Sequence, residues 1–238
     1  MASKADITNY DKIASKYIDH VNKNNSWNNM YERPYMLSEF DDFRDKKVLD
    51  IGCGTGFYSF YALKQQASVS SVDASQEMLD YVKEKDDSGS LNLFKSDLAD
   101  GLPFIEDNSQ DYIICSLVIH YLENWDQLVK DFHRVLKPSG KVYISTHHPF
   151  GDVLVHEKES YFDKYLIHDT WGNRGNRFPV SYFTRSLTDV LKPFLDSELK
   201  ILKIDEPLPS EEYKHLNSDA FNYLQKNPAF IFLVLKKE

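Results

Sequence analysis

Residues 48–56, with the sequence VLDIGCGTG, constrain the fold of this chain more than any other stretch. The apolar run from Val48 to Ile51 predicts a short buried strand, because a parallel strand is covered on both faces. Three glycines follow at alternate positions, and residues 57–66 can form a helix. Glycine has no Cβ, so the loop of such a strand–loop–helix unit lets backbone approach a ligand closely. The stretch predicts a ligand site, or otherwise only a tight strand–helix turn.

The glycine spacing and one carboxylate indicate which ligand to expect. A dinucleotide fingerprint has the spacing G-x-G-x-x-G, whereas here the third glycine, Gly56, comes one residue early and Phe57 follows it. Asp50 stands at the end of the predicted strand. Its charge would repel a pyrophosphate and attract a ligand that carries a sulfonium or ammonium group.

The nonapeptide resembles motif I of the class I S-adenosylmethionine (SAM)-dependent methyltransferases. The resemblance implies that SAM is the cofactor and S-adenosylhomocysteine the product. It also implies that Asp50 recognises the amino-acid end of SAM. The other residues of the loop that it assigns to the cofactor are Gly52, Cys53, Gly54 and Gly56.

Residues 67–73 read as a second strand that ends in Asp73, seventeen positions after Gly56. This is close to the offset at which a carboxylate accepts both ribose hydroxyls of a bound nucleoside. Asp73 matches motif II of the family, although it could also cap the helix predicted for residues 75–85. Ala74 is assigned to the cofactor with it. Met78 would lie near the adenine or in the core.

Two further motifs follow the next strands. A third strand at residues 91–95 leads into Asp97 and Leu98, which match motif III. The resemblance implies that Asp97 contacts the adenine amine and that the Leu98 amide contacts the ring, the alternative being a solvated loop. A fourth strand at residues 110–118 matches motif IV and places Ser116 at one wall of the methyl-transfer site.

Histidines supply the candidates for a catalytic base. His147 and His148 follow a fifth strand at residues 141–146, after a helix at 124–136, and His120 follows the fourth strand. A base is needed only if the acceptor arrives protonated, and we rank the three in the order His147, His148, His120. No metal is expected, because adjacent strand residues point to opposite faces and no cluster has zinc spacing.

The segments on either side of this core are less regular. Residues 6–21 have the spacing of an amphipathic helix that either packs on the sheet or covers the cofactor, with Tyr10 or Tyr17 reaching it. A short helix is expected at 35–43. Residues 150–182 are rich in aromatic residues and read as an antiparallel excursion that shapes the substrate pocket, the alternative being a dimer contact or an edge cover.

The C-terminal part completes the expected fold. Ser186 begins a short helix that Pro193 should end or kink. Strands at 199–204 and 230–235 would form a closing hairpin, joined by a polar stretch at 206–227. Alternating strands and helices predict a doubly wound α/β fold with a mostly parallel seven-stranded sheet and an antiparallel last strand. We expect one domain, 1–238, made of a helical cover (1–45), a SAM-binding core (46–147), an insertion (148–185) and closing elements (186–238).

Composition narrows the function. The net charge of −9 argues against nucleic acid as a substrate. No apolar run reaches the length of a membrane span, and the two cysteines read as reduced cytoplasmic residues. We therefore expect a cytoplasmic enzyme, a monomer or homodimer, that methylates a small-molecule acceptor. The alternatives are a non-catalytic SAM-binding or scaffolding protein and a NAD-dependent oxidoreductase, which the glycine spacing opposes.

Overall fold

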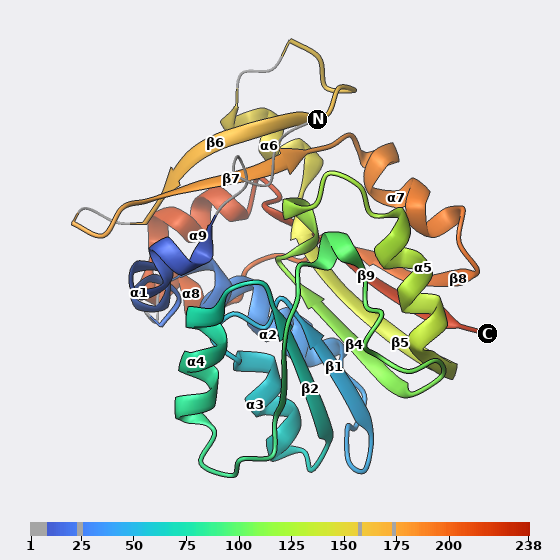
Figure 1. Cartoon of the computed structure of the whole chain (residues 1–238). Coiled ribbons are helices and arrows are strands. Elements are labelled where there is room, and N and C mark those ends of the chain that lie inside the picture. The colour runs from blue at the N-terminus through green and yellow to red at the C-terminus, as the bar shows by residue number, and fades with distance from the viewer. Residues whose placement is uncertain (1–8, 23–25, 157–158, 173–174) are drawn as a thin grey trace.

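The computed structural model describes residues 9–22, 26–156, 159–172 and 175–238. Within these residues, seven strands form one sheet in the order β3–β2–β1–β4–β5–β9–β8 (Figure 1). The first five of these pair in parallel, and β9 runs antiparallel to both of its neighbours. This confirms the predicted mostly parallel sheet. The strands are β1 (Lys47–Ile51), β2 (Ser68–Asp73), β3 (Asn92–Lys95), β4 (Gln110–Ser116), β5 (Leu136–His147), β8 (Leu199–Asp205) and β9 (Phe230–Lys237).

Helices cover both faces of the sheet, and the pleat of each strand decides which face a residue serves. Val48 and Leu49 are both fully buried, but they belong to different hydrophobic clusters, because successive strand residues point to opposite faces. One cluster contains residues of α5 (Asp126–Val135) and α7 (Leu187–Leu195). The other contains residues of α2 (Arg33–Glu39) and α3 (Phe57–Lys64). The helix α4 (Gln76–Lys85) packs beside β2 and β3.

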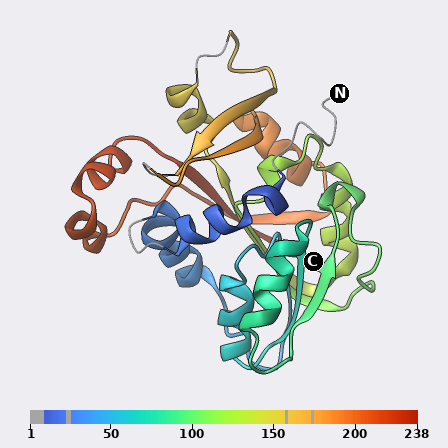
Figure 2. The same ribbon diagram turned by 60° about the vertical axis from the view of Figure 1, so that its left-hand side comes forward.

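The insertion lies over the carboxyl ends of the parallel strands. It begins with a helix that we did not predict, α6 (Pro149–Val155), and continues as the antiparallel hairpin β6 (Tyr165–Trp171) and β7 (Phe178–Thr184). Helix α1 (Tyr10–Val21) contacts α4 and β7. Figure 2 shows α1 lying between the hairpin and α4. The hairpin, α6 and α1 therefore cover the edge of the sheet at which ligands of such folds bind.

The structure adds to or differs from the expected elements at several places. Pro193 does not end α7, which continues to Leu195, because Phe194 is fully buried and holds the last turn in place. The polar stretch at 206–227 contains α8 (Glu211–Leu216) and α9 (Ser218–Leu224). The helix expected at 35–43 begins earlier, at Arg33, and a π-helical turn (Asn28–Glu32) precedes it. None of the helices in the described part of the chain is long and apolar enough to cross a bilayer.

Candidate active site

Strand register brings the predicted cofactor residues to one rim. Ile51, the last residue of β1, pairs with Val72 on one side and with Cys115 on the other. Asp73 and Ser116 are therefore the next residues of their strands at the same edge of the sheet. The main-chain N–H of Ser96 donates to the carbonyl of Asp73 at 3.0 Å, which draws the segment containing Asp97 to this edge.

Asp73 holds the glycine loop against the end of β2. Its Oδ2 accepts the N–H of Gly54 at 2.9 Å, and its Oδ1 accepts the N–H of Ser75 at 2.9 Å. Burial raises the pKa of Asp73, whereas these main-chain bonds lower it. The two carboxylate oxygens have four lone pairs, and the main-chain donors are Gly54, Ser75 and, more weakly, Ala74, so the group can still accept a hydroxyl hydrogen. This is the capacity that a ribose needs.

Two glycines of the loop have left-handed backbone but different surroundings. Gly52 has φ +66°, and a Cβ there would stand 2.3 Å from Cγ2 of Val118, far inside van der Waals contact. Gly54 has φ +51°, and its Cβ would meet only the ring of Tyr17, at 3.9 Å. At Gly54 the backbone is therefore bare toward the space under α1, as a closely bound ligand requires.

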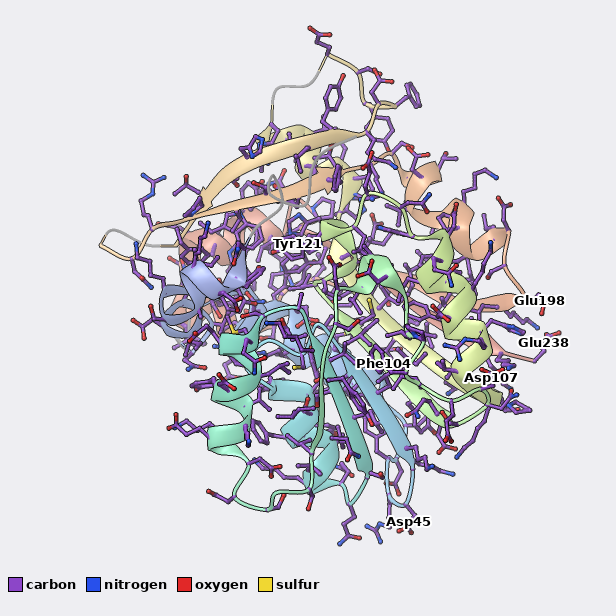
Figure 3. All side chains as sticks on the ribbon, in the orientation of Figure 1. Asp45, Phe104, Asp107, Tyr121, Glu198 and Glu238 are labelled. Carbon is purple, nitrogen blue, oxygen red and sulfur yellow. The ribbon has the colours of Figure 1, made fainter. Side chains whose placement is uncertain are left out.

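Hydrogen bonds attach α1 across this space. The hydroxyls of Tyr10 and Tyr121 lie 2.5 Å apart, and Oδ1 of Asp11 accepts the hydroxyl of Ser75 at 2.6 Å. Tyr121, labelled in Figure 3, lies near the centre of the molecule below the hairpin. The described contacts of α1 are with α4 and β7, and its role as a cover of the cofactor stays a prediction. Burial raises the pKa of Tyr17 to about 12, which keeps its hydroxyl neutral over the loop.

Asp50 lies deeper than Asp73. It is only 2% exposed, and its Oδ2 accepts the hydroxyl of Ser59, on α3, at 2.5 Å. Burial raises the pKa of Asp50 to about 7, although the bonds from Ser59 lower it. A cation bound nearby would favour the ionised form of this carboxyl.

The residues expected around the adenine occupy several environments. Asp97 caps the 3₁₀ turn Leu98–Asp100 by accepting the N–H of Ala99 at 2.9 Å. Leu98 and Met78 are buried, and Ala74 is exposed. Asp97 and Ala74 are therefore accessible to a ligand, while Leu98 and Met78 present mainly apolar packing.

A buried carboxylate that we did not assign to the site lies beside Ser116. Glu32 is 1% exposed, and it accepts hydroxyls from Tyr58 at 2.7 Å, Ser116 at 2.8 Å and Ser145 at 2.6 Å. Burial raises the pKa of Glu32 despite these three donors. The network ties the π-helical turn to the ends of β4 and β5. Ser116 thus uses its hydroxyl on Glu32, and no local pattern in the sequence indicates such long-range partners.

The three histidines have different surroundings. His148 caps α6 by accepting the N–H of Phe150 on Nδ1 at 3.1 Å, and its Nε2 lies 2.5 Å from Glu206. His120 is buried, and burial, reinforced by His147 and Arg185, lowers its pKa well below the usual value. Its ring stacks on that of His147, with centroids 3.9 Å apart.

His147 is the histidine that faces a cavity large enough for a ligand. This cavity of about 460 Å³ lies between α1, the hairpin, α6 and the start of β9. Its volume suits a small molecule. The aromatic residues in its wall are Tyr17, Trp27, Tyr121, Trp171, Tyr182, Tyr223 and Phe230. Sequence reasoning placed the pocket in the insertion but did not identify the acidic residues Asp152 and Asp169 that also line it.

Within the described residues, no group of three or more histidine, cysteine or acidic side chains is arranged to hold a metal ion. That the protein uses no metal therefore stays a prediction from the sequence. The rim itself presents groups suited to a cationic nucleoside: a carboxylate with spare acceptor capacity at Asp73, bare backbone at Gly54 and a second carboxylate at Asp50.

Comparison with known proteins agrees with this geometry. A family model described as a methyltransferase domain matches residues 49–144. The crystal structure of a proposed S-adenosylmethionine-dependent methyltransferase from Listeria monocytogenes superposes with a TM-score of 0.73 at 26% identity, covering 87% of this chain and 96% of that one. The protein is a SAM-dependent methyltransferase with the class I fold. SAM is its cofactor, and S-adenosylhomocysteine is the product.

Two relatives show how far sequence similarity extends in this methyltransferase. An uncharacterized protein of Haemophilus influenzae is 26% identical over 89% of each chain. A demethylmenaquinone methyltransferase of Staphylococcus epidermidis is 31% identical over 57% of each chain. The methyltransferase thus aligns with little more than half the length of that named enzyme, so the relative does not identify its acceptor.

Proposed function

We propose that this methyltransferase transfers the methyl group of SAM to a small molecule bound in the aromatic cavity. One observation carries the proposal. Tyr17 lies over Gly54 of the cofactor loop and also lines the cavity, so the two spaces share a wall. Leu117 and Tyr121, which follow the end of β4, line the same cavity. An acceptor held there would lie next to the cofactor.

The roles of individual residues follow from their places at the rim. We assign Asp73 to the ribose hydroxyls, Asp97 and Leu98 to the adenine, and Ala74 and Met78 to its surroundings. The loop from Gly52 to Gly56, with Cys53 and Asp50, is assigned to the amino-acid end, and Ser116 and Tyr17 to the walls. When bound, SAM supplies a methyl group already activated by its sulfonium. The chain's own task is to orient that group and to exclude water, for which α1 provides the cover.

His147 is our proposed base for an acceptor that arrives protonated. It lines the cavity, and its Nδ1 lies 3.7 Å from Oδ1 of Asp152. The positions of His148, a helix cap, and His120, a buried neutral ring, support that role less well. We further propose that residues 1–45 cover the cofactor and that 148–185 shape the acceptor pocket of one methyltransferase domain.

Other parts of the proposal rest on composition. A cavity of about 460 Å³ and a net charge of −9 support a small acceptor over a nucleic acid. The two cysteines are free and buried, which supports a reducing, cytoplasmic location. The name of the demethylmenaquinone relative makes a quinol-type ring one acceptor to test. A monomer and a homodimer both fit these observations.

Two measurements test the function. Isothermal titration should show micromolar binding of S-adenosylhomocysteine, and labelled SAM incubated with a panel of amines, phenols, thiols and carboxylates should yield a labelled product. If S-adenosylhomocysteine binds but no compound of the panel is methylated, the non-catalytic alternative is favoured. Failure to bind S-adenosylhomocysteine would contradict the proposal as a whole.

A further inference from the structure

We propose that the acceptor is a protonated amine with an apolar or aromatic body, and that Asp152 binds its ammonium group inside the cavity. The inference rests on the proposed function, because it places this amine in the acceptor pocket of a methyltransferase. It names a charge that neither the family nor the relatives specify. The inference is argued from two carboxylates, those of Asp152 and Asp169, and from the aromatic rings around them.

Asp152 is a buried carboxylate without a hydrogen-bonding partner in the described chain. Its side chain is 8% exposed, and its one described contact is with Nδ1 of His147 at 3.7 Å, beyond hydrogen-bond length. Buried carboxylates are normally paired or fully hydrogen-bonded, because their desolvation is costly. Asp152 lines the cavity, so a ligand cation there would supply the missing partner.

Arg185, whose charge Asp152 influences, does not fill this role. Arg185 is buried, and its guanidinium donates to the carbonyls of Phe183, Leu122 and Glu123. It also lies over the ring of Trp125 at 4.4 Å, and no ion pair with Asp152 is formed. Its charge acts on Asp152 only at longer range. The donors of Arg185 are thus directed to main-chain oxygens and not into the acceptor cavity.

The charges that line the cavity favour a cation. Within the described residues, the lining contains the carboxylates of Asp152 and Asp169 but no lysine or arginine, its two bases being His20 and His147. Asp169 accepts the indole N–H of Trp171 at 3.1 Å, which leaves its charge unneutralised. An anionic acceptor would face both carboxylates. Three arginines lie in or directly after the insertion: Arg177 is exposed, Arg185 donates to main-chain oxygens, and Arg174 lies outside the described residues.

Aromatic rings complete a site for an organic cation. Tyr182 and Trp171 lie with their ring centroids 5.8 Å apart, and both pack beside His147, at 4.4 and 5.6 Å. Ring faces attract a cation within about 6 Å of their centroids, and more strongly when water is excluded. The same rings offer flat apolar surface to the body of the amine.

The chemistry of methylation is consistent with this arrangement. The ammonium gives up one proton, which passes to the Asp152–His147 pair, and the nitrogen lone pair is freed. That lone pair forms the bond to the methyl carbon while the carbon–sulfur bond breaks and its electron pair stays on sulfur. The positive charge thereby passes from sulfur to nitrogen, so the product is a methylated ammonium, and the released proton stays on the carboxylate–imidazole pair.

Matched ligands of different charge test the proposal. We would titrate the protein, saturated with S-adenosylhomocysteine at pH 7.5, with 2-phenylethylamine, 2-phenylethanol and phenylacetate. Tryptamine and hexylamine, each compared with the alcohol of the same carbon skeleton, extend the series to other apolar groups. We expect at least one amine to bind about tenfold or more tightly than its alcohol, as a charge-assisted bond would give, and phenylacetate not to bind.

Variants locate the preference. Asp152→Asn keeps the shape of the side chain and should reduce the amine-to-alcohol ratio to about two or less, and Asp169→Asn should reduce it in part. Asp163→Asn, which alters an exposed residue of the same insertion, should leave the ratio unchanged. Binding of S-adenosylhomocysteine should be equal in all variants, which shows that they are folded.

The outcomes separate this inference from the proposed function. If S-adenosylhomocysteine binds but no amine binds more tightly than its alcohol, the acceptor is not a cation and the inference is overturned. An amine preference that survives in Asp152→Asn overturns the assignment to this carboxylate. If S-adenosylhomocysteine does not bind, the proposed function fails and the inference fails with it.

Discussion

Oδ2 of Asp73 accepts a hydrogen bond from the main-chain N–H of Gly54 at 2.9 Å, joining two residues that stand 19 positions apart in the sequence. The bond ties the end of β2 to the loop that follows β1. One carboxylate therefore shapes the glycine loop and also presents its remaining lone pairs to a ligand. This double duty makes Asp73 the first residue to test.

Replacing Asp73 by alanine should weaken binding of S-adenosylhomocysteine by at least about tenfold, because both the ribose acceptors and the loop contact are lost. Isothermal titration measures the change directly. Asp80→Ala is the matched control, since Asp80 is an exposed aspartate on the neighbouring helix α4. Equal affinity of a folded Asp73→Ala protein and the wild type would remove Asp73 from the site.

Gly52→Ala should destabilise the fold by about 2–4 kcal/mol, through backbone strain and a clash with Val118. Gly89→Ala separates the two causes. Gly89 has φ +62°, but a Cβ added there would meet no atom within 4 Å, so only strain of about 1 kcal/mol is expected. Urea unfolding gives both values. The double variant with Val118→Ala should recover part of the loss at Gly52, and equal costs at the two glycines would mean that the clash is relieved elsewhere.

Asp50 predicts a pH-dependent stability. Its pKa of about 7 in the folded chain exceeds the ordinary value of an unfolded aspartate, so between these values the native state binds the extra proton. Stability from this group is present at low pH and is lost as the pH rises toward 7. Relative to Asp50→Asn, the free energy of unfolding of the wild type should therefore fall by roughly 2–3 kcal/mol from pH 5 to pH 8. Urea unfolding of both proteins at both pH values measures this change. If the wild type instead gains stability relative to Asp50→Asn as the pH rises, Asp50 is ionised in the native state.

Replacing Glu32 should lower the free energy of unfolding by more than is usual for a residue in a short turn. Glu32→Ala leaves the hydroxyls of Tyr58, Ser116 and Ser145 without their acceptor, and we expect a loss of about 3 kcal/mol. Glu32→Gln should cost less, because an amide can still bond to hydroxyls. Glu39→Ala, which breaks a partly exposed bridge to Lys203, should cost under about 1 kcal/mol. Thermal unfolding compares the three, and similar losses for Glu32→Ala and Glu39→Ala would contradict a structural role of the buried network.

The sequence by itself determined the parallel core and its rim. Strands β1 to β5 follow from short apolar runs, and Asp73 follows from its offset to Gly56, because strand, loop and helix signals there depend on neighbours a few residues away. Once the strands are parallel, their carboxyl ends must meet at one edge. The resemblance to the methyltransferase motifs rests on this same local pattern, which is why the family could be named from residues 46–147.

Only the tertiary structure decided the acceptor side of the site. Asp152 lies in a helix that we did not predict, and the cavity that it lines is completed by residues of α1 and of the hairpin, which come from other parts of the chain. Glu32 likewise finds its hydroxyl partners on three separate elements, up to 113 positions away. Contacts of this kind are formed by tertiary packing and not by the helix or strand propensity of nearby residues. Packing also overrides the tendency of proline to end a helix: α7 continues past Pro193, and the buried Phe194 stabilises its last turn.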